Sequence, residues 1–151
     1  MIEVTVTKEM TFDCAHMLSN YDGKCANLHG HTYKVLVTVG GTQLEAGSSK
    51  GMIIDFNHLK QAMNMYIKEL FDHAIIFSSR EYRGTAEQEL FEWAEKHNMR
   101  HYVMPYRTTA EYMAILFQDL IQAYLLNNLG LTNITEVHVK VYETPTSYSE
   151  V

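Results

Sequence analysis

The sequence is poor in residues that cross-link or interrupt a chain. Its 151 residues include two prolines, two cysteines and one tryptophan. Two cysteines are too few for a disulfide framework, so a reducing cytosol is the simplest expected compartment. No apolar run approaches the ~20 residues of a membrane span, and no basic region followed by an apolar stretch marks a secretory signal at the N-terminus. We therefore expect a cytoplasmic chain with no membrane partner.

Positive charge is also scarce. Lys and Arg total 12 against 18 Asp and Glu, which gives a formal net charge of −6 with no basic run. Duplex binding needs many phosphate contacts, so nucleic acid is a poor candidate partner. Hydrophobic residues make up 46% of the chain and charged residues 20%, a globular balance. Because the length suits one domain, we predict a single domain over residues 1–151.

Alternating hydrophobicity predicts the strands. In a half-buried strand successive side chains point to opposite faces, so apolar and polar residues alternate. Alternation or β-branched composition marks strands at residues 2–7, 31–39 and 136–143, with short extended pieces at 51–54 and 74–77. The first two strands are separated by a long excursion, and we expect them to pair.

Helical periodicity predicts two main helices. Asp55 can cap the first, in which apolar residues recur at three- and four-residue steps over residues 56–70. The second follows a capping-box pattern at residues 108–111. Residues 78–107 are harder to assign beyond a short helix after a similar pattern at 85–88. This order predicts an α+β domain with helices on one face of an antiparallel sheet.

Three histidines lie where strand pairing would bring them together. His29 and His31 flank Gly30 at the start of a strand, so both imidazoles can project from one face. His16 follows the first strand and comes opposite them if the two strands pair antiparallel. Three imidazoles with an open fourth position make a catalytic rather than a structural zinc site. The alternative is a strand start that carries surface histidines.

A cysteine near this cluster has two possible roles. Cys25 precedes His29 by four residues. As a fourth zinc ligand it would close the site and make it structural. As a free thiol near a cation it would be reactive, because the cation lowers its pKa. An inert apolar role is less favoured beside Lys24 and Asn27, whereas Cys14 is best interpreted as a core residue.

Six short blocks occur in a fixed order along the chain, at residues 12–16, 25–31, 51–56, 72–73, 108–111 and 139–144. This order resembles the 6-pyruvoyltetrahydropterin synthase superfamily over nearly the whole chain. The three-residue gap between Cys25 and the His-Gly-His is most similar to the 6-carboxytetrahydropterin synthase branch of bacterial queuosine biosynthesis. Residues 78–107 are longer than the usual connection of the family, and we interpret them as a variable insertion.

The resemblance implies site roles residue by residue. It implies that Zn²⁺ is the cofactor and that its ligands are His16, His29 and His31. It implies that the catalytic residues are Cys25, Asp72 and His73. It implies that the pterin ring is anchored by Glu143, with further pocket positions at Thr108, Thr109 and Glu111. Taken without the resemblance, Asp72 and His73 could simply end a helix, and Thr108 and Glu111 could serve only its cap.

The resemblance also implies a fold and a reaction. The fold would be a tunnelling fold (T-fold): a four-stranded antiparallel sheet with two main helices on one face. Subunits would join into a barrel, as a tetramer or hexamer with active sites between subunits. The substrate would be 7,8-dihydroneopterin triphosphate, and the products 6-carboxytetrahydropterin, acetaldehyde and triphosphate.

Other functions and the triphosphate contacts stay open. One alternative is a 6-pyruvoyltetrahydropterin synthase, which eliminates triphosphate without carbon–carbon cleavage. The others are a non-catalytic Cys-His₃ zinc module and a pterin-binding relative with altered chemistry. Candidate cations for the triphosphate are Lys24, Lys34, Arg80, Arg83 and Arg107.

Overall fold

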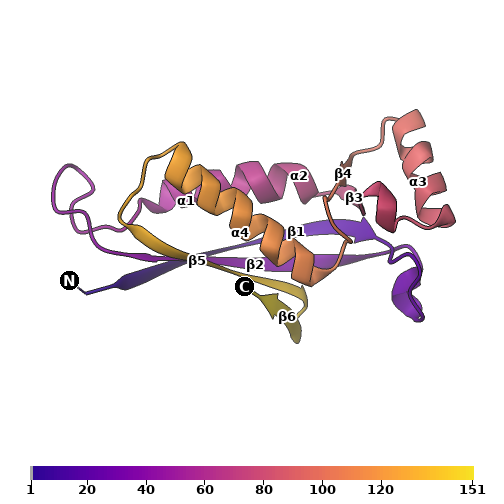
Figure 1. The fold of residues 1–151 in the computed structure, drawn as a ribbon, viewed down its shortest axis with the longest axis horizontal. Helices are drawn as coiled ribbons and strands as arrows, with labels where there is room; N and C mark the ends of the chain where they lie inside the picture. The colour runs from indigo at the N-terminus through magenta and orange to yellow at the C-terminus, as the bar shows by residue number, and fades with distance from the viewer. Residues whose placement is uncertain (1) are drawn as a thin grey trace.

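A six-stranded mixed sheet forms the centre of the structure, a computed structural model that describes residues 2–151. The strand order across the sheet is β4-β3-β1-β2-β5-β6. The strands are β1 (Val4–His16), β2 (His29–Gly41), β3 (Ala74–Phe77), β4 (His101–Val103), β5 (Ile134–Thr144) and β6 (Ser147–Glu150). The long strands β1, β2 and β5 run along the long axis of the molecule (Figure 1).

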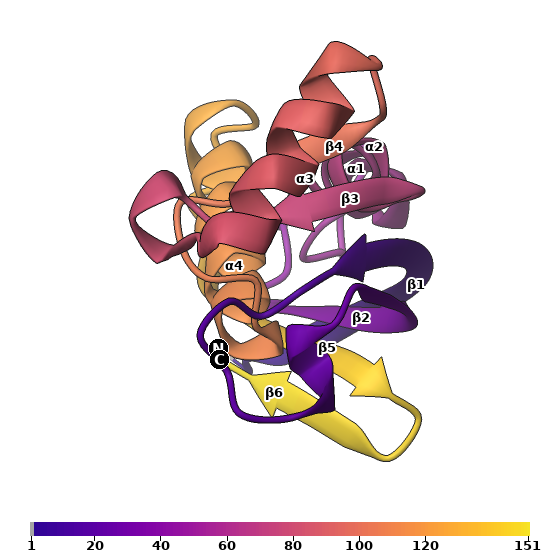
Figure 2. The ribbon, with the colours of Figure 1, turned by 90° about the vertical axis from the view of Figure 1, so that its right-hand side faces the viewer.

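The main helices cover one face of this sheet (Figure 1). They are α1 (Phe56–Met63), α2 (Glu69–Phe71), α3 (Thr85–Lys96) and α4 (Ala110–Asn127). A π-helical stretch (Asn64–Lys68) joins α1 to α2, and short 3₁₀ helices lie at Lys24–Ala26 and Arg80–Tyr82. Helix α3 stands apart from the others, at the end of the sheet that carries β3 and β4 (Figure 2).

The predicted four-stranded antiparallel sheet was wrong in strand number and direction. The pairs β1–β2, β2–β5 and β5–β6 are antiparallel, but β3 pairs in parallel with both β1 and β4. Strand β4 has three residues and β6 has the polar sequence SYSE, so neither carries a readable alternation. The α+β class with helices on one face is confirmed.

The core lies between the helices and the inner side of β1, β2 and β5. Alternate valines on β2 and β5 are buried there, as the strand pattern predicted. Helices α1 and α4 add Leu59, Met63 and Phe117, all fully buried. Phe56 does not join them: it starts α1 and is 53% exposed. The predicted extended piece at residues 51–54 forms turns and bends instead.

The caps of α1 and α4 differ in how well they were predicted. The Asp55 side chain accepts a hydrogen bond from the Asn57 backbone at 2.8 Å, which confirms the first cap. At α4 the cap is Thr109, whose hydroxyl accepts from the Tyr112 backbone at 3.3 Å, and not Thr108. Thr108 is therefore free to face the interior, where it is fully buried.

Helix α3 is tied to the loop that follows β1. The predicted capping box at residues 85–88 was wrong, because Gly84 is the cap and no side chain bonds to it. Glu87 turns inward and is fully buried. Its carboxylate accepts hydrogen bonds from the Ser78 backbone at 2.7 Å and from the Ser19 hydroxyl at 2.5 Å. Arg107 donates to the Ser19 carbonyl at 2.6 Å. Residues 78–107 therefore fix the start of the loop that carries Cys25.

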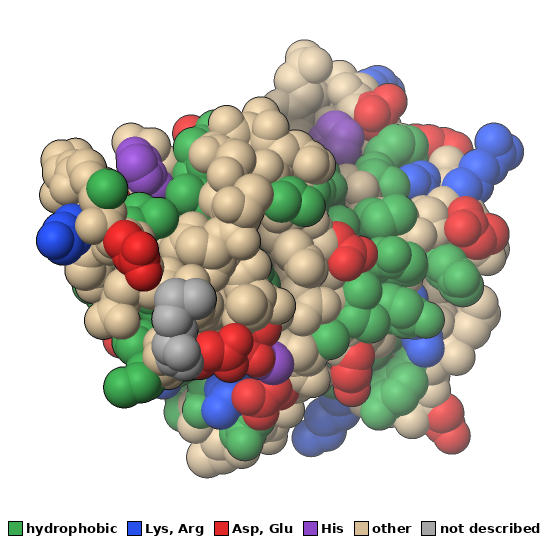
Figure 3. All heavy atoms as spheres, turned by 60° about the vertical axis from the view of Figure 1, so that its left-hand side comes forward, with side chains coloured by type: hydrophobic (Ala, Val, Ile, Leu, Met, Phe, Trp, Pro, Cys, Tyr) green, Lys and Arg blue, Asp and Glu red, His purple; other side chains and the backbone are tan. Residues whose placement is uncertain are grey.

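The helix-free face of the sheet is polar. The residues of β1, β2 and β5 that alternate with the buried ones include Thr7 and Thr38, whose hydroxyls lie 2.7 Å apart. Figure 3 brings forward a different side, the left-hand side of Figure 1, where Lys and Arg side chains are scattered among Asp and Glu rather than gathered in one patch. Within residues 2–151, no helix combines the length and the apolar character that crossing a membrane requires.

Candidate functional site

The paired ends of β1 and β2 bring three histidines together. The antiparallel register places His16 opposite His29, and His31 opposite Cys14. All three side chains therefore project on the core side of the sheet. One ligand atom from each ring lies within 4.8 Å of the others, the only such group of three or more metal-binding side chains in residues 2–151. This is the convergence that strand pairing predicted.

Backbone carbonyls orient two of these rings. His16 Nδ1 lies 2.8 Å from the Thr108 carbonyl, and His29 Nδ1 lies 2.6 Å from the Asn27 carbonyl. A carbonyl only accepts, so Nδ1 carries the hydrogen in both rings and Nε2 keeps its lone pair. Such carbonyl contacts are the usual supports of metal-binding imidazoles.

Two ring nitrogens in the cluster are buried and have no hydrogen-bond partner. Nε2 of His29 and Nε2 of His31 make no hydrogen bond. Buried polar atoms in this state are rare and costly. A cation held between the rings would satisfy both atoms, and three neutral imidazoles suit Zn²⁺ with an open fourth position. The donor set therefore fits the ion, although its role as a metal site stays a prediction.

Burial favours the neutral forms of His16 and His31. His16 is 2% exposed, and desolvation lowers its pKa from 6.5 to about 4. Desolvation also lowers the pKa of His31, and the nearby Glu143 carboxylate partly opposes that shift. The lone pairs of these two rings are therefore available at neutral pH. The buried Tyr33 hydroxyl lies 3.4 Å from His16 Nε2, and burial raises the pKa of Tyr33, so it stays protonated.

Glu143 lies beside the histidine cluster. It shares the inward parity of Val139 and Val141, and its Oε1 is 3.6 Å from His31 Nε2. Both residues line a hollow of about 470 Å³ on the surface, together with Lys34. This size is within the range of small-molecule sites. The structure thus places a carboxylate where a ligand could contact it and the cluster together.

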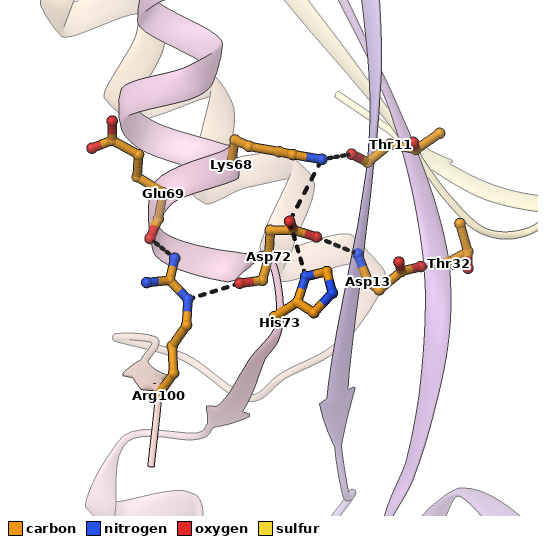
Figure 4. Close-up of polar contacts among 8 residues, drawn as sticks. All are labelled: Thr11, Asp13, Thr32, Lys68, Glu69, Asp72, His73 and Arg100. Atoms are coloured by element: carbon orange, nitrogen blue, oxygen red, sulfur yellow. Dashed lines mark hydrogen bonds and ion pairs between the residues drawn. The ribbon is translucent and has the colours of Figure 1, made fainter. Parts of the chain in front are cut away.

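Asp72 and His73 lie just beyond the end of α2 (Figure 4). Asp72 Oδ1 accepts from the Asp13 backbone at 2.9 Å, and Oδ2 lies 3.0 Å from His73 Nδ1. The Asp13 bond, more than the His73 contact or Lys68, holds the Asp72 pKa below its ordinary value. His73 lines a second hollow of about 470 Å³ with Cys14 and His31.

Cys25 stands apart from both hollows. It lies in the 3₁₀ helix Lys24–Ala26, is half-buried, and its carbonyl accepts from the Leu18 backbone at 2.9 Å. Its sulfur does not belong to the group of ligand atoms that lie within 4.8 Å of one another. It lines neither of the hollows that contain His31. Within one chain, the structure thus does not bring Cys25 and His73 into one cavity.

The other sequence-predicted pocket residues have mixed surroundings. Thr108 is buried, and both its carbonyl and its hydroxyl face His16. Thr109 caps α4, and Glu111 is exposed on the first turn of that helix.

Sequence reasoning missed Tyr33, although its parity with His29 and His31 was a usable signal. It also missed Glu87, for which the only signal was a pattern that looked like a helix cap.

Comparison with known proteins places the chain among relatives. Residues 5–151 match the family described as 6-pyruvoyl tetrahydropterin synthase. The chain belongs to this family. A 6-carboxy-5,6,7,8-tetrahydropterin synthase of Haemophilus influenzae is 36% identical, with 96% of each chain covered. A protein of the same name from Aquifex aeolicus is also 36% identical, over 84% of this chain and 75% of its own. An enzyme of the tetrahydropterin synthase type is therefore confirmed.

Solved structures agree on the fold. The 6-pyruvoyl tetrahydropterin synthase of Plasmodium vivax has a TM-score of 0.73 at 17% identity, with 100% of this chain and 98% of that chain covered. An uncharacterised protein from Wolinella succinogenes has a TM-score of 0.74 at 20% identity and the same coverage. The predicted T-fold class is thus confirmed, with six strands rather than four.

Proposed function

We propose that this chain is a zinc-dependent 6-carboxytetrahydropterin synthase. The reaction would convert 7,8-dihydroneopterin triphosphate and one water into 6-carboxytetrahydropterin, acetaldehyde and triphosphate, in the cytoplasm and toward queuosine. The observation that carries the proposal is the cluster of His16, His29 and His31 with two unpartnered ring nitrogens, beside the Glu143 carboxylate. The relatives that carry this name at 36% identity support it.

The chain's own residues supply binding and proton transfer. His16, His29 and His31 would hold the ion, which as a Lewis acid lowers the pKa of substrate groups bound to it. Glu143 would accept hydrogen bonds from the N–H edge of the pterin, as a carboxylate does with paired donors. The Cys25 thiolate would remove the side-chain proton of the substrate. His73, oriented by Asp72 at 3.0 Å, would accept or return a proton.

The separation of Cys25 from His73 supports a site completed between subunits. His73 opens onto the hollow shared with His31, and Cys25 lines neither hollow near the cluster. Strand β3 pairs with β1 only at Cys14 and Ala15, so most of that edge of β1 lacks a strand neighbour. Joining such edges across copies into a barrel removes an aggregation hazard. We therefore propose a homo-oligomer, a tetramer or a hexamer.

Contacts within the chain reduce the number of Lys and Arg side chains that could bind the triphosphate. Arg83 Nε donates to the Ser78 carbonyl and Arg107 donates to the Ser19 carbonyl, so both already serve the loop structure. Lys34 lines the hollow that contains Glu143. We propose that Lys34 contributes to substrate binding there.

Product analysis tests the proposed reaction. Purified zinc-loaded protein is incubated with 7,8-dihydroneopterin triphosphate, and the products are identified by mass spectrometry with an assay for acetaldehyde. The proposal expects acetaldehyde and 6-carboxytetrahydropterin in equal amounts. A 6-pyruvoyl product without acetaldehyde would support the alternative synthase, and no turnover by the assembled, zinc-loaded protein would remove both reactions.

A cysteine variant separates the enzyme from a structural zinc module. In Cys25→Ala the proposal expects zinc to be retained and turnover to be lost, because the three histidines hold the ion without the sulfur. If Cys25 completes a Cys-His₃ structural site, the opposite result is expected: the variant loses zinc and its fold is destabilised. Zinc content by mass spectrometry and a thermal unfolding curve distinguish the two.

A further inference from the structure

Arg100 reaches from the segment before β4 to the C-terminal end of α2. Its Nε donates to the Asp72 carbonyl at 2.7 Å, and its Nη2 donates to the Glu69 carbonyl (Figure 4). The last carbonyls of a helix have no partner within the helix. One guanidinium thus caps α2, and its planar arrangement of donors lets it contact two carbonyls at once.

The peptide between Asp72 and His73 is held from both sides. Arg100 holds its carbonyl, and its N–H donates to the Asp13 carbonyl at 2.6 Å. His73 has a φ of +59°, the left-handed conformation that is disfavoured for residues with a Cβ. Because the two contacts fix the plane of this peptide, they hold His73 in a conformation that it would otherwise leave.

The same conformation places the side chains of the pair. The Asp13 N–H donates to Asp72 Oδ1, while Asp72 Oδ2 faces His73 Nδ1 at 3.0 Å. With its peptide fixed, the His73 ring lines the hollow that also contains His31. His73 is itself 76% exposed, so packing does little to fix the ring and the backbone must do it.

We propose that Arg100 is a positioning residue for the Asp72–His73 pair. It holds the peptide in the left-handed conformation from which His73 faces both the Asp72 carboxylate and the hollow. The inference rests on the proposed role of His73 in turnover and extends it, because Arg100 lies outside every motif and within residues 78–107. It gives that segment a function in the site.

Kinetics of Arg100 variants test the proposal. Arg100→Ala is expected to lower kcat by roughly 10- to 100-fold, the cost of a misplaced catalytic group, with KM and zinc content unchanged within about twofold. Arg100→Lys keeps the charge but not the two-carbonyl contact, so its kcat should be intermediate. Lys96→Ala, an exposed cation at the end of α3, is the control and should match wild type. An unchanged kcat in Arg100→Ala overturns the proposal, and if that variant does not fold, an unchanged kcat in Arg100→Lys does so.

A double variant separates positioning from general damage. If Arg100 acts through His73, adding Arg100→Ala to His73→Ala causes no further loss of kcat, because coupled residues are not additive. If the two losses multiply, Arg100 acts elsewhere and the proposal fails.

Hydrogen exchange tests the peptide contact independently of the reaction. The His73 amide should exchange about 10-fold faster in Arg100→Ala, while the Ile76 amide within β3 stays protected. Equal protection of His73 in wild type and variant would overturn the proposal. If wild type shows no turnover, the proposed function fails, yet this measurement still decides whether Arg100 holds the peptide.

Discussion

The two parts of the site are held in place by different means. The histidine cluster lies on paired strands, and its innermost member His16 is 2% exposed with a backbone carbonyl orienting its ring. The Asp72–His73 pair lies past a helix end, where 76% of the His73 side chain is exposed. Strand register and burial fix the first part, whereas hydrogen bonds to a single peptide fix the second.

This difference separates the expected effects of substitutions. We expect a change in the histidine cluster to remove ion binding and turnover together, because no neighbouring side chain can replace a ring on a paired strand. We expect a change at the exposed pair to lower turnover and to leave ion binding intact. Measuring zinc content beside kcat therefore tests the comparison itself.

The largest effect is expected from a ligand substitution. His29→Ala should weaken zinc binding by more than the roughly 100-fold that loss of a supporting residue can cost, and turnover should disappear with the ion. Chelator competition measures the affinity. His138→Ala, an exposed histidine that contacts Glu136, is the matched control and should bind zinc like wild type. Full zinc binding by His29→Ala would show that the cluster is not the metal site.

The next largest effect concerns the sharing of the site between subunits. Cys25→Ala and His73→Ala should each lower turnover by roughly 100- to 10,000-fold, the usual contribution of a positioned acid or base. If the two residues meet across a subunit interface, co-expressing both variants rebuilds some sites with neither substitution. Mixed oligomers should then recover part of the wild-type activity. No recovery in confirmed mixed oligomers would place both residues in one subunit's site.

The predictability of the site follows the same division. The positions of His16, His29 and His31 followed from the period of two residues along paired strands. No comparable period governs the Asp72–His73 pair, since its conformation depends on Arg100, 27 residues further along and not on a periodic face. Interactions between such distant residues leave no local pattern in one sequence.

The errors in the fold have a similar origin. Strand β4 was missed because three residues are too few for an alternation, and it pairs with β3 only after residues 78–100 bring the chain back to the sheet. A capping box was predicted at residues 85–88 because Gln88 follows Thr85 by three residues, but Gly84 is the cap. Within that pattern, Glu87 turns inward and bonds to the half-buried hydroxyl of Ser19, 68 residues away in the sequence. Tertiary contacts overrode the local signal in both cases.

A smaller effect, on stability, should show whether residues 78–107 also support the loop that follows β1. Glu87→Gln replaces a buried acceptor of two hydrogen bonds with an amide that cannot serve both donors equally. We expect a loss of about 1–3 kcal/mol in unfolding free energy, measured by urea denaturation. Glu89→Gln, exposed on the same helix, should change stability by less than about 0.5 kcal/mol. Equal stability of the two variants would show that the contacts of the Glu87 carboxylate with Ser78 and Ser19 contribute nothing to stability.

The smallest effect is a pH dependence at the exposed pair. The hydrogen bond from the Asp13 backbone lowers the Asp72 pKa from its ordinary value of 3.8, with smaller contributions from His73 and Lys68. The unfolded chain therefore binds its proton at a higher pH than the folded one. The stability that this carboxylate contributes is present above pH ~4 and is lost as pH falls through the lowered folded pKa. Asp72→Asn should lose that part of the acid dependence, and Asp119→Asn, exposed on α4, should keep it. Identical acid unfolding of Asp72→Asn and wild type would show that the hydrogen bond between this carboxylate and the Asp13 backbone of β1 does not contribute to stability.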